Sequence, residues 1–164
     1  MKVTELHYRA QATPADQQHV HDIVASTGFF SPDEIDIAVE LVTERLEKGP
    51  ESGYHFIFAE ADSRTVGYSC FGPIPATKYS YDLYWIAVHA DWRGNGIGKL
   101  VLRASENAIK EMGGRRVYVE TSGRDQYKPT RAFYLSCDYN EEAHLVDFYA
   151  PGDAKFFYVK DLGT

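Results

Sequence analysis

The residues from Tyr81 to Gly98, YDLYWIAVHADWRGNGIG, constrain the fold of this chain more than any other stretch. Asp82–Val88 is apolar and aromatic with a β-branched end, a pattern that predicts a buried strand. Arg93–Gly98 is rich in glycine and leads directly into an amphipathic helix. Glycines let the backbone approach a phosphate closely, and the free N–H groups and dipole of a helix N-terminus attract its charge. The stretch therefore predicts a site for a phosphate-bearing ligand.

The glycine spacing argues against two common nucleotide-binding motifs. A mononucleotide P-loop needs Ser or Thr after its lysine, but Lys99 is followed by Leu100. A dinucleotide fingerprint G-x-G-x-x-G starts well at Gly94 and Gly96 but has Lys99 in place of the third glycine. A dinucleotide fold also needs several further βα units, whereas only one further short helix is expected here after the amphipathic helix that follows the loop. A nucleotide-binding oxidoreductase fragment is therefore disfavoured.

Composition bounds the remaining choices. A chain of 164 residues is expected to form one domain, residues 1–164, and its 44% hydrophobic content suits a packed core. The net charge of −7 argues against nucleic acid as a partner. No apolar run approaches the ~18–20 residues of a membrane helix, and the N-terminus lacks the apolar stretch of a signal peptide. Two cysteines without metal spacing indicate neither a metal site nor a disulfide framework, so we expect a cytoplasmic protein without a metal or a membrane partner.

The rest of the chain alternates between strand and helix patterns. A capping box, Ser31-Pro32-Asp33-Glu34, predicts a helix start, and Thr13-Pro14 predicts another with threonine as its cap. Further helices are expected after Gly98 and over Thr130–Cys137. Strands are expected at Val3–Arg9, Tyr54–Glu60, Thr65–Gly72, Asp82–Val88, Arg115–Glu120, His144–Ala150 and Lys155–Lys160. The strand–helix–strand unit around the glycine turn predicts a parallel strand pair.

Two segments resemble one known family. Arg93, Gly96 and Gly98 match R/Q-x-x-G-x-G/A, which is similar to the acyl-CoA-binding loop of the GNAT N-acetyltransferase superfamily. Thr130–Tyr139, TRAFYLSCDY, resembles the family's A-x-x-F-Y-x-x-x-G-F/Y segment. The two segments occur in the family's order and are separated by a helix and a strand. The resemblance implies an α/β fold whose mixed, mostly antiparallel sheet has flanking helices and one splayed pair of parallel strands.

The resemblance also implies acetyl-CoA as co-substrate, lying where the two parallel strands splay. Its pyrophosphate would rest on the backbone N–H groups of the loop, and its thioester carbonyl would lie near the strand backbone at Ala87 and Val88. The loop residues assigned to the cofactor are Arg93, Gly94, Asn95, Gly96, Ile97, Gly98 and Lys99. Arg93, Lys99 and Arg103 give this region a local positive charge.

The chemistry requires a base and an acid. Because pH 7 lies ~3.4 units below the pKa of a lysine-like amine, deprotonating that amine costs roughly 4.6 kcal/mol of free energy. Asp82 is the candidate general base, with a solvated strand end or a salt-bridge partner as the alternative interpretation. Glu120 is the second choice, with a surface or loop-anchoring acid as its alternative. Tyr134 matches the family's proton donor to the departing thiolate, with buried aromatic packing as the alternative interpretation. A chain that binds acyl-CoA as a sensor without catalysis is the alternative function.

The sequence indicates the acceptor-binding residues less clearly than the cofactor loop. Phe30, Tyr81 and Tyr84 come from segments that line the acceptor side in this family, with core or rim packing as the alternative interpretation. A small-molecule or peptide amine is the expected partner, and homodimers are common in the family. The chain departs from the family pattern at Tyr127, where a cofactor-binding Asn is usual, and at Asp138, where Gly is usual.

Overall fold

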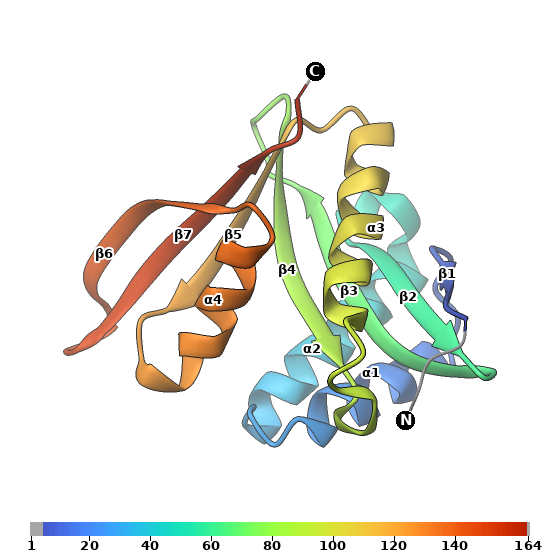
Figure 1. The fold of residues 1–164 in the computed structure, drawn as a ribbon. Helices are drawn as coiled ribbons and strands as arrows, with labels where there is room; N and C mark the ends of the chain where they lie inside the picture. The colour runs from blue at the N-terminus through green and yellow to red at the C-terminus, as the bar shows by residue number, and fades with distance from the viewer. Residues whose placement is uncertain (1–4, 164) are drawn as a thin grey trace. The chain divides into compact units, whose positions relative to one another are not determined.

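A computed structural model of the protein describes residues 5–163 (Figure 1). The strands are β1 (His7–Arg9), β2 (His55–Ala61), β3 (Arg64–Pro73), β4 (Ser80–Val88), β5 (Arg116–Ser122), β6 (Asn140–Ala150) and β7 (Asp153–Asp161). The α-helices are α1 (Asp16–Ser26), α2 (Pro32–Lys48), α3 (Ile97–Glu111) and α4 (Lys128–Ser136). Short 3-10 turns are η1 (Gly49–Ser52), η2 (Ala90–Trp92) and η3 (Asp125–Tyr127). The predicted first strand begins only at His7, and the start of its predicted range lies outside the described residues.

The seven strands form one mixed sheet in the order β1-β2-β3-β4-β5-β7-β6. Only the β4–β5 pair is parallel among the described strand pairings, and it joins Ser80–Asp82 to Arg116–Tyr118. The mixed α/β architecture with one parallel pair, predicted from the strand–helix–strand pattern, is therefore confirmed. The paired stretch of β4 and β5 ends at Asp82 and Tyr118.

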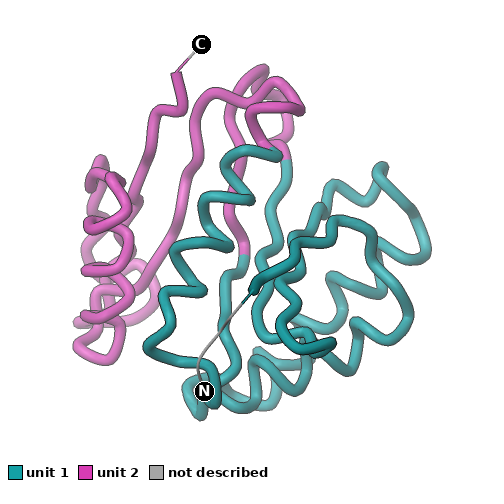
Figure 2. The backbone as a smooth tube through the Cα atoms, turned by 45° about the vertical axis from the view of Figure 1, so that its right-hand side comes forward, with its two compact units in different colours: residues 1–72, 85–108 teal, residues 73–84, 109–164 magenta. Residues whose placement is uncertain are grey.

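The chain divides into two compact units, coloured separately in Figure 2. Unit 1 comprises residues 1–72 and 85–108, and unit 2 comprises residues 73–84 and 109–164. Both β4 and α3 contribute residues to each unit. The expectation of one domain over residues 1–164 stays a prediction.

Unit 1 has helices on both faces of the β1–β2–β3 strands. Alternate side chains of β2 point to opposite faces, because Phe56 and Phe58 pack with α1 and α2, whereas Ala59 and Ala61 pack with the start of α3. The β2–β3 hairpin turns at Asp62 and Ser63, whose φ angles of 49° and 62° are the left-handed values that a tight hairpin needs. The first core cluster contains Val20, Ile23, Val24, Ala38, Val42, Phe56, Phe58, Tyr68, Cys70 and Ala87.

Unit 2 pairs β5 with β7 along the full length of β5, from Arg116↔Asp161 to Ser122↔Lys155. Helix α4 packs on this sheet through Tyr134, whose ring lies 6.3 Å from that of Tyr158 on β7. The outer strand β6 is paired less regularly, because its ladder with β7 is interrupted between Leu145 and Ala150.

The two predicted helix starts differ in outcome. Ser31 and Glu34 form the reciprocal capping box at α2, with Pro32 in the first turn, as the sequence predicts. The prediction for α1 is wrong in detail, because the helix begins at Asp16 without a side-chain cap. Thr13 instead donates to the Asp16 carboxylate through both its backbone N–H (2.7 Å) and its hydroxyl (3.1 Å).

Candidate active site

The loop between β4 and α3 is a tight turn built on two glycines. Gly94 and Gly96 have φ angles of 79° and 70°, and a Cβ added at either would meet no atom within 4 Å. The Asn95 side-chain amide donates to the carbonyl oxygens of Trp92 (2.9 Å) and Arg93 (3.3 Å) and so fixes the turn. The buried side chains of Trp92 and Ile97 anchor the two ends of the loop in one core cluster. The open side of the turn is therefore backbone that a ligand can approach closely.

The backbone N–H groups of this loop are available to an acceptor. Those of residues 94–99 donate to no atom of residues 5–163, and the first hydrogen bond of α3 runs from Leu100 N to Gly96 O at 3.3 Å. Helix α3 has 15 residues, so its dipole adds positive potential at the same end. Lys99 and Arg103 are exposed one helical turn apart. Free N–H groups, a helix N-terminus and two cations suit an anionic phosphate group.

Helix α1 holds the loop from the other side. The Arg93 guanidinium donates to the Thr27 carbonyl at 3.2 Å, and the Ala90 N–H donates to the Ser26 hydroxyl at 3.0 Å. Arg93, which the sequence assigns to cofactor binding, thus also ties the loop to the end of α1. Sequence reasoning missed Ser26 and Thr27, because they lie far from the loop along the chain. Arg93 and Thr27, for example, are 66 residues apart.

The end of β4 lies close against β3. A Cβ at Gly67 would lie 3.2 Å from the Ala87 carbonyl oxygen and 3.5 Å from a methyl group of Val88, so glycine lets the two strands approach here. Ala87 is buried with the α1–α2 core, and Val88 packs with Trp92 and Ile97 in the second cluster. Ala87 and Val88 thus belong to the same unit as the loop and lead directly into it.

Asp82 is the last β4 residue in the ladder with β5 and is half-buried. Burial raises the pKa of its carboxyl group, the nearby charge of Glu120 raises it further, and the charge of Lys155 lowers it. A carboxylate with a raised pKa is a stronger base than a free aspartate. Glu120 differs, because its carboxylate forms an ion pair with the Lys155 ammonium at 3.0 Å.

Tyr134 lies on α4 with its ring buried. It packs edge-on against Tyr139 at 5.6 Å and against Phe133 at 5.3 Å. Within residues 5–163, the fully buried side-chain polar atoms without a hydrogen bond belong to Tyr68 and Trp92. The Tyr134 hydroxyl also forms no hydrogen bond in that range, and the residue is only 4% exposed. Burial raises its pKa, which keeps the hydroxyl protonated at neutral pH.

The three predicted acceptor residues lie in different surroundings. Phe30 is half-buried, with its ring 5.0 Å from that of Trp85. Tyr81 is buried in unit 2, where its hydroxyl donates to the Met112 carbonyl at 3.5 Å. Tyr84 is 39% exposed and follows Asp82 by two residues on β4, so both side chains project from the same face of the strand.

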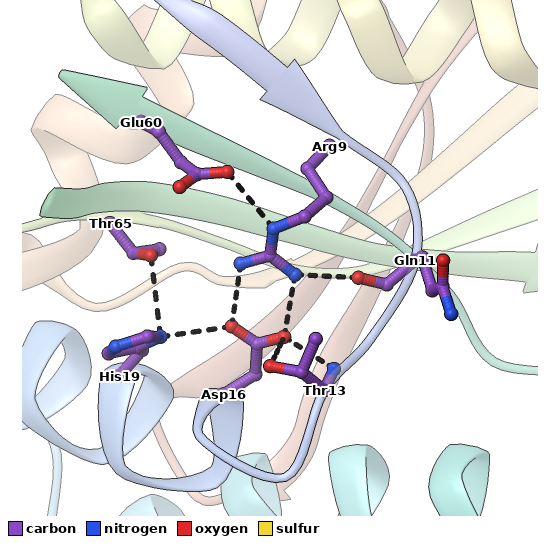
Figure 3. A network of polar contacts seen from close by, with 7 residues as sticks. All are labelled: Arg9, Gln11, Thr13, Asp16, His19, Glu60 and Thr65. Atoms are coloured by element: carbon purple, nitrogen blue, oxygen red, sulfur yellow. Dashed lines mark hydrogen bonds and ion pairs between the residues drawn. The ribbon is translucent and has the colours of Figure 1, made fainter. Parts of the chain in front are cut away.

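A second polar cluster in unit 1 is structural (Figure 3). The fully buried Asp16 carboxylate accepts two hydrogen bonds from the Arg9 guanidinium, at 2.7 and 2.8 Å, and lies 3.0 Å from His19 Nδ1. Thr65 Oγ1 lies 3.3 Å from the same His19 nitrogen. A catalytic relay would pass a proton between the two ring nitrogens, so this arrangement around one nitrogen cannot act as one. The cluster ties β1, α1 and β3 together.

Two further findings concern metal binding and membrane insertion. No three His, Cys, Asp or Glu side chains within residues 5–163 lie where they could hold one metal ion. None of the helices in that same part of the chain has the length and apolar composition needed to cross a bilayer.

A mixed sheet with one parallel strand pair, and a glycine turn with free amides at the start of α3, make an α/β fold suited to a phosphate-bearing cofactor. The model of the acetyltransferase (GNAT) family matches residues 20–139, which include parts of both units. A Desulfovibrio desulfuricans protein assigned to the GNAT acetyltransferases is 43% identical, with a TM-score of 0.95 over 97% of this chain and 100% of that one. The chain therefore belongs to the GNAT acetyltransferase family.

More distant structures share the fold. The aminoglycoside 6'-N-acetyltransferase from Enterococcus faecium has a TM-score of 0.77 at 18% identity, over 98% of each chain. A Salmonella typhimurium protein described as an acetyltransferase and solved with its cofactor acetyl-CoA has a TM-score of 0.74 at 16% identity, over 98% of this chain and 96% of that one. A comparison with curated proteins gave no match.

Proposed function

We propose that this protein transfers the acetyl group of acetyl-CoA to the amine of an acceptor. The single observation that carries the proposal is the loop of residues 94–99, whose backbone N–H groups have no acceptor within residues 5–163 and stand at the positive end of α3. Membership of the GNAT family and the acetyl-CoA-bound structure of a distant relative support the same cofactor. The pyrophosphate would accept hydrogen bonds from the loop, with Arg93 and Lys99 adding positive charge.

In this proposal Asp82 receives the proton of the acceptor ammonium, directly or through water. The free amine then attacks the thioester carbon and forms the C–N bond, which leaves a positive charge on nitrogen. The nitrogen releases its second proton to solvent as the C–S bond breaks with its electron pair leaving on sulfur. One N–H group of the β4 backbone around Ala87 and Val88 is the proposed donor to the carbonyl oxygen, which becomes negative in the tetrahedral intermediate. The raised pKa of Asp82 brings this base closer to the pH at which it works.

Tyr134 is the proposed donor of the proton to the departing thiolate. A free tyrosine against a free thiol would make this transfer uphill by roughly 2 kcal/mol. Burial raises the pKa of Tyr134. A thiolate that forms in the same poorly solvated surroundings is destabilised by the same effect. The pKa difference between the tyrosine and the thiol therefore need not widen.

The acceptor side is proposed to include Tyr84, with Phe30 and Tyr81 as the other candidates. Tyr84 shares a strand face with Asp82 and is 39% exposed, so its ring can contact an acceptor whose amine lies at Asp82. An acidic protein with a net charge of −7 also favours the approach of a cationic acceptor.

Titration calorimetry with acetyl-CoA on a Gly96→Asp variant tests the loop. The new carboxylate would stand on the open side of the turn. Like charges about 4 Å apart at an effective dielectric constant of about 20 repel by about 4 kcal/mol. The expected loss of affinity is therefore roughly 1000-fold.

Gly53→Asp is the matched control. Gly53 also has a positive φ, 79°, and open space around its missing Cβ, but it lies between η1 and β2. Both variants pay the same left-handed strain of ~1–2 kcal/mol, so only the cofactor affinity should separate them. Undiminished binding by Gly96→Asp would show that the loop does not hold the cofactor.

A further inference from the structure

Lys155 has unusual surroundings for a lysine. It is the third residue of β7, pairs with Ser122 of β5 and with Leu145 of β6, and its side chain is only 11% exposed. Its ammonium lies 3.0 Å from Glu120 Oε2, 4.2 Å from the ring centre of Phe148 and 5.1 Å from that of Phe157. Lysines are rarely covered to this degree unless they are paired, and aromatic faces stabilise a cation held over them.

The irregular part of β6 builds this environment. The β6–β7 ladder is interrupted between Leu145 and Ala150, and within the interruption Asp147 has a φ of 55°. The Asp147 carboxylate accepts a hydrogen bond from the Gly152 N–H at 2.8 Å, which stabilises the distortion. Bulges of this kind redirect side chains, and here Phe148 and Tyr149 come within 4.2 and 5.9 Å of the Lys155 ammonium.

Two carboxylates interact with the charge of this ammonium, and they differ in their contacts. Glu120 is bound to it directly, whereas the Asp82 side chain forms no hydrogen bond or ion pair with any of residues 5–163. Asp82 shares a face of the sheet with both, because it pairs with Tyr118, two residues before Glu120 on β5, and Lys155 pairs with Ser122, two residues after it. Its charge therefore interacts with theirs. The cluster therefore holds one paired carboxylate and one unpaired one.

The geometry points to Lys155 as a positioning residue that engages Glu120 and leaves Asp82 as the one carboxylate of this pair that is available to an acceptor amine. The inference rests on the proposed function, because it assigns Asp82 the role of base there. It also decides between the two carboxylates that the sequence offers as the base. Lys155 itself need not touch the acceptor.

The charges around the cluster fix the expected pH effect. Asp82 on β4 faces Glu120 on β5, which raises its pKa, and Lys155 on β7, which lowers it. Lys155 is also flanked by Tyr149 of β6, and Tyr149 in turn interacts with Asp153 and Tyr127. Removal of the Lys155 charge removes the one lowering influence on Asp82. Because the base must be deprotonated, the acidic limb of the kcat/KM profile then moves to higher pH.

The test compares Lys155→Met, which keeps an unbranched chain against the rings, with Lys155→Arg, which keeps the charge. Lys78→Met is the control, because Lys78 also lies over an aromatic ring, that of Tyr79 at 5.4 Å, but has no recorded carboxylate partner within residues 5–163. Two quantities are measured for each variant: the pH profile of kcat/KM, and the titration of the Asp82 carboxyl carbon by NMR, which needs no turnover.

For Lys155→Met we expect both the acidic limb of the kcat/KM profile and the titration of Asp82 to move to higher pH. Its kcat/KM should fall several-fold below the limb and approach that of the unmodified protein well above it. Lys155→Arg should restore the position of the limb, and Lys78→Met should leave both readouts in place. An Asp82 titration unmoved in Lys155→Met, or moved equally by Lys78→Met, would overturn the inference. A clear titration shift in a protein that acetylates no amine would instead count against the proposed function, and the role of Lys155 in it would fall with it.

Discussion

At the scale of single residues, Tyr134 joins two properties that rarely occur together. Its ring is packed between aromatic neighbours, while its hydroxyl has no bonded partner within residues 5–163. A tyrosine kept only for packing would lose little when the hydroxyl is removed. A tyrosine kept as a proton donor would lose its function with the ring still in place.

Tyr134→Phe separates these two roles. General acid catalysis contributes about 100-fold or more, so we expect kcat to fall by at least that factor while the calorimetric affinity for acetyl-CoA stays the same. The unfolding temperature should change little, because the ring contacts remain. Tyr158→Phe, a buried tyrosine of β7 that stacks on the Tyr134 ring at 6.3 Å, is the control and should retain kcat. An unchanged kcat for Tyr134→Phe on a proven acceptor would remove Tyr134 as the acid and favour the packing role.

At the scale of elements, the Asp16 cluster shows why α1 begins where it does. Arg9 reaches Asp16 and also Glu60 on β2, at 3.0 Å from its Nε atom. Burial by itself would raise the pKa of Asp16, but hydrogen bonds from Arg9, His19 and Thr13 together outweigh it and hold that pKa below the usual value. Asp16 in the first turn of α1 is thus stabilised by Arg9 of β1 and by Thr13, while the N-cap residue Ala15 offers no side-chain hydrogen bond.

Asp16→Asn should therefore destabilise the protein in a pH-dependent way. Breaking a buried ion pair whose partner is partly exposed costs ~2–4 kcal/mol, which corresponds to a fall in Tm of about 4–16 °C for a chain of this size. A carboxyl group with a lowered folded-state pKa contributes its stability above the unfolded pKa of about 3.9 and loses it as pH falls through the folded value. Urea unfolding from pH 7 to pH 3 should show the two proteins converging in acid.

The exposed Asp36→Asn on α2 should leave the free energy of unfolding within about 0.5 kcal/mol at every pH. If Asp16→Asn had the same pH slope as the unmodified protein, the lowered pKa of Asp16 would be refuted.

The comparison of these elements shows which features a sequence can predict. The capping box at Ser31 is local, because both of its hydrogen bonds span three residues, and the pattern alone predicts it. The glycine turn is likewise encoded by adjacent residues whose positive φ angles only glycine adopts at low cost. The cluster at the start of α1 also includes the Arg9–Glu60 pair, whose members are 51 residues apart, so no local pattern predicts that part of it.

The same distinction applies to the site. Lys155 and Glu120 form their ion pair between neighbouring strands, and the aromatic cover of Lys155 arises from an interruption in β6 that has no turn signature of its own. Sequence reasoning therefore found the candidate base but not the residue that sets it apart from Glu120. It also could not tell that the hydroxyl of Tyr81, chosen because its segment lines the acceptor side in the family, bonds to the Met112 carbonyl just after α3.

At the scale of the whole molecule, the two compact units share two continuous elements. Residues 80–84 of β4 belong to unit 2 and residues 85–88 to unit 1, while α3 contributes residues 97–108 to unit 1 and 109–111 to unit 2. A helix or strand forms cooperatively, so neither unit can unfold completely without disrupting an element of the other. This continuity predicts one unfolding transition for the chain, in agreement with the expectation of a single domain.

The two tryptophans make this testable, because Trp85 and Trp92 both lie in unit 1, whereas far-ultraviolet circular dichroism reports the backbone of both units. We expect the two signals to give one Tm. We further expect acetyl-CoA or CoA at 100 times its Kd to add ~2.7 kcal/mol and to raise that Tm by roughly 5–11 °C in both signals, because a ligand held by the loop stabilises everything that unfolds with it. NADH and ATP should raise neither signal. A rise with NADH alone would restore the dinucleotide interpretation of the glycine turn, and a rise with acetyl-CoA in the tryptophan signal alone would show that the units unfold separately despite sharing β4 and α3.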